Sequence, residues 1–136
     1  MAHLLRILTY GFYMAHLGWA TWGILRLYDH IGPTFGSAAP FYFVWTLTPV
    51  VVAHFGLKKW GHHRAATGVM LMGSLIVFMM TMALVRNQLM TDHIGPMAMM
   101  MYIPFPLTEV LIVALGLVLA RWLAARASMS GKGLSR

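Results

Sequence analysis

Residues 65–85 read AATGVMLMGSLIVFMMTMALV, a stretch without a single charged residue. Its length falls within the about 17–25 residues that an α-helix needs to cross the hydrocarbon core of a bilayer. Three further apolar stretches occupy Leu4–Leu27, Phe41–Leu57 and Leu107–Leu123. A segment inside lipid must satisfy its own backbone hydrogen bonds, which favours helices. The sequence therefore predicts an all-α integral membrane protein, a bundle of four transmembrane helices.

The composition agrees with a bilayer environment. Of the 136 residues, 60% are hydrophobic and only 10% are charged, and the mean hydropathy is +0.72. Soluble domains carry about 25% charged residues. We expect a single membrane domain over residues 1–136, with no room for a separate soluble catalytic module. The absence of cysteine excludes disulfides, thiolate zinc sites and iron–sulfur ligation.

The basic residues indicate topology rather than nucleic-acid binding, because they punctuate the apolar stretches instead of clustering on one polar face. If the four helices alternate in direction, only Arg26 and Arg86 fall on one side of the membrane. The other basic residues fall on the opposite side: Arg6, Lys58, Lys59, Arg64, Arg121, Arg126, Lys132 and Arg136. By the positive-inside rule this side is cytoplasmic. We therefore expect a multi-pass protein of the inner cell membrane with both termini in the cytoplasm.

Two internal matches indicate a tandem duplication. Asp29-His30-Ile31-Gly32-Pro33 returns as Asp92-His93-Ile94-Gly95-Pro96, 63 positions later. Leu47-Thr48-Pro49-Val50 is echoed by Leu107-Thr108-Glu109-Val110, 60 positions later. The two offsets imply a three-residue insertion or deletion between the matches.

Each half of the duplication contains two predicted spans, so both halves have the same orientation. We expect repeat 1 at about 1–60, repeat 2 at about 61–124 and a basic cytoplasmic tail at 125–136. Such parallel repeats are related by a pseudo-twofold axis along the membrane normal. The two Asp-His-Ile-Gly-Pro loops are then expected on the same, outer face.

These loops suggest a metal site at the outer face. Its candidate ligands are Asp29, His30, Asp92, His93 and Glu109. Histidine and carboxylate together suit a transition metal such as copper, iron or zinc. The spacing matches no established metal motif, and turn chemistry alone explains the aspartate, glycine and proline. Glu109 has an alternative role as well: with Pro106 as the first helical residue, its carboxylate would cap the first turn.

His16 and His54 are candidate cofactor ligands, since paired histidines on helices hold b-type haem. Their depths in the membrane differ by about 9 Å by helical rise, which argues against a bis-histidine pair. Haem ligation by His16 with Met79 or Met80 is a second option. The third interpretation is that His16 forms a hydrogen bond across the bundle or to a partner subunit.

Three functional hypotheses follow. The first is a small subunit of a larger, energy-converting membrane complex, carrying a metal or another cofactor near its outer face. The second is a small ion or solute transporter or channel, and the third is a membrane metal-binding protein using the paired Asp-His loops. The expected partners are lipid and other membrane subunits, or a second copy of the chain. No nucleophile–base motif or phosphate-binding loop is present, so catalysis by the chain alone is not expected.

Overall fold

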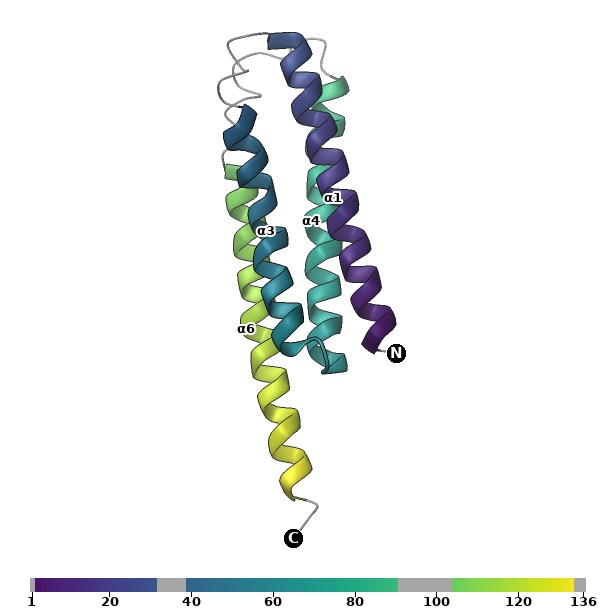
Figure 1. Cartoon of the computed structure of the whole chain (residues 1–136), viewed down its shortest axis with the longest axis vertical. Coiled ribbons are helices and arrows are strands. Elements are labelled where there is room, and N and C mark those ends of the chain that lie inside the picture. Colours follow the sequence, from purple (N-terminus) through teal and green to yellow (C-terminus); the bar gives the residue numbers. More distant parts are fainter. Residues whose placement is uncertain (1, 32–38, 91–103, 134–136) are drawn as a thin grey trace.

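The computed structural model describes residues 2–31, 39–90 and 104–133. Within these residues the chain is all-helical and contains no strand. The four helices are α1 (Ala2–Ile31), α3 (Ala39–Trp60), α4 (Arg64–Met90) and α6 (Pro104–Gly133). They stand side by side in one elongated bundle (Figure 1). The end at which α1 ends and α6 begins, at the top of Figure 1, is called the upper end below.

Three of the helices are long and apolar enough to cross a membrane, as predicted. The qualifying segments are Pro40–Trp60, Arg64–Asn87 and Pro104–Ala127. Helix α1 is long enough but is not among them. Its tyrosines, tryptophans and glycines, together with His16, lower its hydropathy. The crossing of the membrane by α1 stays a prediction.

The helices do not pack in the order in which they follow one another. Helix α1 packs most extensively on α4, and α6 packs on both α4 and α3, whereas the consecutive helices α3 and α4 make little contact. The chain ascends in α1, descends in α3, ascends in α4 and descends in α6 (Figure 1). Parallel helices are therefore neighbours, α1 with α4 and α3 with α6.

A tight turn joins α3 to α4. The backbone N–H of Gly61 donates a hydrogen bond to the carbonyl of Leu57 (3.0 Å). The Thr67 hydroxyl lies within hydrogen-bond distance of the carbonyls of Gly61 and His63. A Cβ atom at position 61 would collide with the carbonyl oxygen of Leu57. Glycine therefore allows this turn to close.

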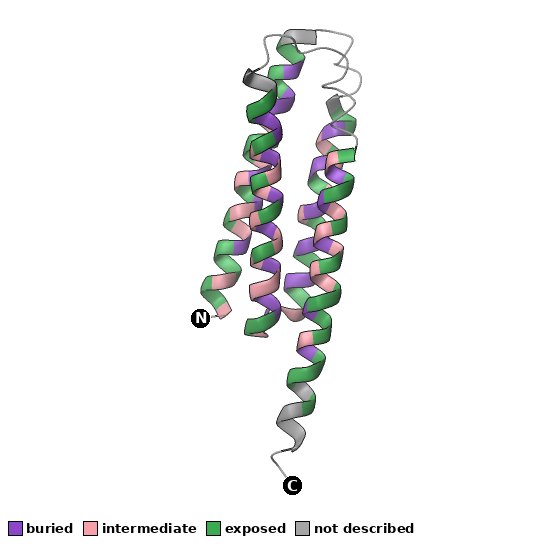
Figure 2. Cartoon of the chain, turned by 180° about the vertical axis from the view of Figure 1, so that it is seen from behind, coloured by how far each residue is buried: buried purple, intermediate pink, exposed green. Residues whose placement is uncertain are grey.

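Buried residues run along the inner sides of the helices and exposed residues along the outer sides (Figure 2). Large apolar side chains such as Val44, Leu115 and Val118 are about two-thirds exposed. Two apolar clusters of the core lie below the polar residues described in the next section, and further buried apolar side chains, among them Ile24, Leu27 and Val85, lie above them. The first contains Tyr13, Ala53, Val77 and Val113, and the second contains Leu57, Ala66, Met70 and Ala120.

Helix α6 differs from its predicted span at both ends. It begins at Pro104 rather than near Leu107, and it continues to Gly133. Residues 125–133 of the predicted tail are thus a helical extension that projects below the other helices (Figure 1). Ala120 and Ala124 are buried against the chain's own bundle, so these small residues serve internal packing.

Candidate functional site

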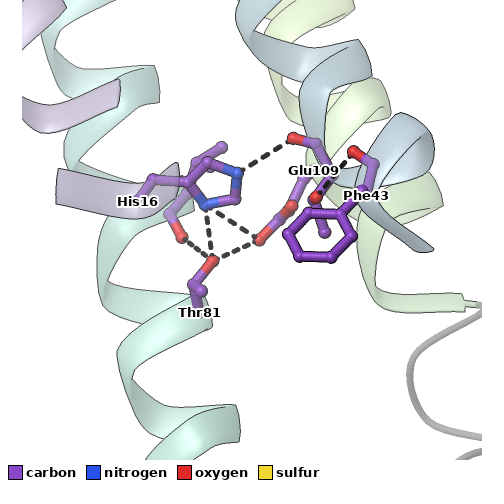
Figure 3. Close-up of polar contacts among 6 residues, drawn as sticks. His16, Phe43, Thr81 and Glu109 are labelled. Atoms are coloured by element: carbon purple, nitrogen blue, oxygen red, sulfur yellow. Dashed lines mark hydrogen bonds and ion pairs between the residues drawn. The ribbon is translucent and has the colours of Figure 1, made fainter. Parts of the chain in front are cut away.

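One residue from each helix contributes to a buried polar layer. The layer consists of His16 on α1, Thr46 on α3, Thr81 on α4 and Glu109 on α6, all with at most 6% of their surface exposed. Figure 3 shows the side chains of His16, Thr81 and Glu109 pointing toward one another between the helices. Thr46, Thr81 and Glu109 lie five or six residues from the upper ends of their spans, a depth of about 8–9 Å.

Hydrogen bonds connect the layer across the bundle. The Thr81 hydroxyl lies 2.6 Å from Glu109 Oε1 and 2.8 Å from His16 Nδ1. His16 Nε2 lies 3.2 Å from the backbone carbonyl oxygen of Thr46. His16 Nδ1 and Glu109 Oε1 are 3.8 Å apart, within ion-pair range. Thr81 is therefore the bridge between the imidazole and the carboxyl group.

Two other buried hydroxyls bond within their own helices. Thr9 donates to the carbonyl of Leu5 (2.7 Å) and Ser74 donates to that of Leu71 (2.8 Å), each within its own helix. Such local bonds are common for Ser and Thr in helices. An imidazole and a carboxyl group have no equivalent local partner, and burying either without hydrogen bonds is costly. The cross-helix contacts of His16 and Glu109 are thus required for the two groups to be accommodated.

A small cavity lies against the upper side of the polar layer. Its volume is about 10 Å³, close to the minimum for one water molecule. Besides the layer itself, the cavity is lined by Ala20, Leu84, Val85, Phe105 and Pro106. On the lower side, the cluster of Tyr13, Ala53, Val77 and Val113 closes the bundle. Buried apolar side chains also lie above the cavity, among them Ile24, Leu27 and Val85, so the polar layer is enclosed on both sides.

No family model, curated protein or solved structure matches this chain. Its chemistry is inferred below from the polar layer and the surface of the bundle.

The two candidate haem ligands lie at different levels. Both ring nitrogens of His16 are in hydrogen bonds within the polar layer. His54 is exposed, and its Nδ1 lies 2.9 Å from the Tyr10 hydroxyl. It follows Thr46 by eight residues on α3, a separation of about 12 Å by helical rise. The interpretation that His16 bonds across the bundle is confirmed.

The candidate metal ligands are only partly covered by the structure. Asp92, His93 and the side chain of His30 lie outside the described residues. Asp29 is exposed near the end of α1, 13 residues beyond His16 and thus about 20 Å higher. Glu109 is buried with His16 instead. Among the residues with described positions, no group of three or more histidines and carboxylates is placed to hold a metal. The outer metal site stays a prediction.

The expected capping role of Glu109 is wrong. Because α6 begins at Pro104, no acidic residue lies in its first turn. The carboxyl group of Glu109 instead reaches Thr81 on the neighbouring helix.

Two members of the polar layer, Thr81 and the Thr46 carbonyl, were not predicted from the sequence. The available signal was a single hydroxyl residue among methionines, Met79-Met80-Thr81-Met82.

Proposed function

We propose that the chain is an integral membrane protein in which all four helices contact lipid. The support is the distribution of its side chains, which is the reverse of that in a soluble protein. The ionisable residues His16 and Glu109 are buried, whereas apolar side chains are exposed on every helix. Helix α1 shares this surface: Leu4, Met14 and Leu25 are each more than half exposed. In water, so extensive an apolar surface would lead to aggregation.

The duplication stays a prediction, and the packing order adds no support for it. A twofold axis along the membrane normal that exchanges α1 with α4 and α3 with α6 would place the members of each pair diagonally across a ring of four helices. In the observed ring of α1, α4, α6 and α3, the members of each pair are neighbours instead. The basic residues Lys58, Lys59 and Arg121 lie toward the lower end. The upper end is accordingly the outer face.

Within this frame, the function that the geometry supports best is that of a small ion transporter with the polar layer as its binding site. The observation that carries this proposal is the buried pair of His16 and Glu109, bridged by Thr81 between three helices. Ionisable groups inside the membrane are costly and usually mark ion pathways. The cavity lies on the side of the layer that faces the outer end, and buried apolar side chains close the bundle above and below it.

Flux into vesicles tests the transporter. The purified protein is reconstituted with a pH-sensitive dye inside, and ion and pH gradients are imposed in turn. Glu109→Gln should reduce the flux at least about tenfold, because it removes the ionisable carboxyl group from the site. Thr108→Val is the matched control, because Thr108 is exposed on the same helix and bonds only the carbonyl of Pro104. Equal flux for the parent and Glu109→Gln would refute the proposal.

A second candidate, a subunit of a larger membrane complex, is favoured by the surface of α1. A shallow hollow there is lined by Ala15, Gly18, Trp19 and Trp22. No other side chain lies within 4 Å of a Cβ placed on Gly18. Small residues beside aromatic ones let an apolar helix of a partner subunit approach closely.

Filling the hollow tests this second candidate. Gly18→Leu adds bulk without disturbing the chain's own core, so partners recovered by gentle extraction should be lost. Val118→Leu adds bulk to an exposed position on α6 and should leave them bound. Recovery of the same partners with Gly18→Leu would reject a role for this surface.

A further inference from the structure

The donor and acceptor roles in the polar layer follow from its geometry. The Thr46 carbonyl is only an acceptor, so His16 Nε2 must carry a hydrogen and donate it. The neutral imidazole has one hydrogen, which leaves Nδ1 as an acceptor. Nδ1 becomes a donor only when the ring binds a second proton.

Thr81 has one hydroxyl hydrogen and three acceptors within reach. They are the carbonyl of Val77 (3.0 Å), Glu109 Oε1 (2.6 Å) and His16 Nδ1 (2.8 Å). With an ionised carboxylate and a neutral imidazole, Oε1 and Nδ1 compete for that single hydrogen. Whichever of Oε1 and Nδ1 does not receive the hydrogen then points a lone pair at a lone pair of the hydroxyl oxygen. A buried acceptor in that position is destabilising.

One additional proton satisfies the contacts of Thr81 with both Glu109 and His16, and it does so in two arrangements. In the first, the protonated carboxyl of Glu109 donates to Thr81 Oγ1, and the Thr81 hydroxyl donates to His16 Nδ1. In the second, His16 is an imidazolium whose Nδ1–H donates to Thr81 Oγ1, and the Thr81 hydroxyl donates to the Glu109 carboxylate. Both arrangements hold the same number of protons.

We propose that the ligand of the polar layer is a single proton, shared between Glu109 and His16 through the Thr81 hydroxyl. This inference rests on the proposed transport function and names its ion. The two arrangements interconvert when the Glu109 O–H bond breaks toward Thr81 while the Thr81 O–H bond breaks toward Nδ1. One proton leaves the carboxyl group, one joins the imidazole, and Thr81 ends with the single hydrogen with which it began.

The surroundings of the layer favour a proton over other ligands. A cavity of about 10 Å³ admits no organic solute. Calcium and similar cations take 6–8 oxygen ligands, whereas the site offers a carboxyl group, a hydroxyl and a carbonyl. The lining of the cavity includes no other ionisable group from α3 or α4. Within the described bundle, Tyr13 lies in electrostatic range of Glu109 from below, and Tyr42 is buried nearer the upper end of α3.

The composition allows a direct test, because Glu109 is the only glutamate in the chain. Glutamate labelled with ¹³C at its carboxyl carbon therefore gives a single signal, and ¹⁵N-labelled histidine with His16→Gln identifies the His16 ring. Both signals are followed by NMR in micelles as the pH is varied. In the parent protein and in Thr81→Ser, which keeps the hydroxyl, the two groups should titrate as a coupled pair.

Thr81→Val removes the hydroxyl at nearly constant shape and should uncouple the pair. The midpoint of the glutamate signal should then differ from that of the parent by about one pH unit or more. If Thr81→Val does not fold, His16→Gln must move the glutamate midpoint by a similar amount. A glutamate signal that titrates identically in the parent, Thr81→Val and His16→Gln would overturn the inference.

This result is separable from transport. Coupled titration without vesicle flux would retain the proton site and reject the transporter. Flux that depends on Glu109 without coupled titration would retain the transporter and reject the proton as its ligand.

Discussion

Thr81 Oγ1 lies 2.6 Å from Glu109 Oε1, although the two residues are 28 positions apart and belong to different helices. The contact ties α4 to α6, and the bond from Thr81 to His16 extends it to α1. A single hydroxyl thus connects three helices at one level. Its removal should affect the stability of the bundle as well as its chemistry.

Thr81→Val should lower the free energy of unfolding by about 1–3 kcal/mol, because it leaves buried acceptors without their donor. Thr81→Ser should cost less, since it retains the hydroxyl and loses one methyl group. Denaturant titration in detergent, followed by circular dichroism, measures both. A Thr81→Val variant that is as stable as the parent would show that the hydroxyl does not stabilise this level.

His16→Leu should destabilise the protein more strongly, by about 3–5 kcal/mol, because it removes one partner of a buried pair. Adding Glu109→Leu should then recover part of the loss, since no carboxyl group is left to satisfy. The four proteins form a double-mutant cycle whose coupling energy we expect at about 0.5–3 kcal/mol. His54→Leu is the control, because the His54 ring is exposed. Additive effects of the two leucine substitutions would contradict the pairing.

The contact between α3 and α6 depends on Gly56. A Cβ atom at this position would collide with the side chain of Leu117 and approach Met70. Gly56→Ala should therefore cost about 1–3 kcal/mol by overpacking. Leu117→Ala in the same chain should relieve part of this cost. Gly11→Ala, at a position inside α1 with no neighbouring side chain within 4 Å, should instead stabilise the protein by about 0.5–1 kcal/mol, and thermal denaturation distinguishes the three variants.

The helices were predictable because each apolar stretch carries its own signal, and three of the four expected spans qualify in the structure. The polar layer was not, since it depends on which helices are neighbours. Glu109 reaches Thr81 only because α4 and α6 pack together, and His16 reaches Thr81 only because α1 packs on α4. Sequence periodicity does not determine this order. Thr81 itself differs from its methionine neighbours only in its hydroxyl group, so it was not singled out.

The last prediction concerns the orientation of the bundle in the membrane. Because the sequence contains no cysteine, single-cysteine variants can test it. Single cysteines are placed at Asp29 and Arg86 near the upper end, and at His62 and Met129 toward the lower end, all at exposed positions. In intact cells, an impermeant maleimide should label the first two. The other two should react only after permeabilisation, because the positive-inside rule predicts a cytoplasmic lower end. Labelling of Asp29→Cys and Arg86→Cys from opposite sides would mean that α1 and α4 are not parallel in the membrane. The expected alternation of the four spans and the outer position of the upper end would then both be lost.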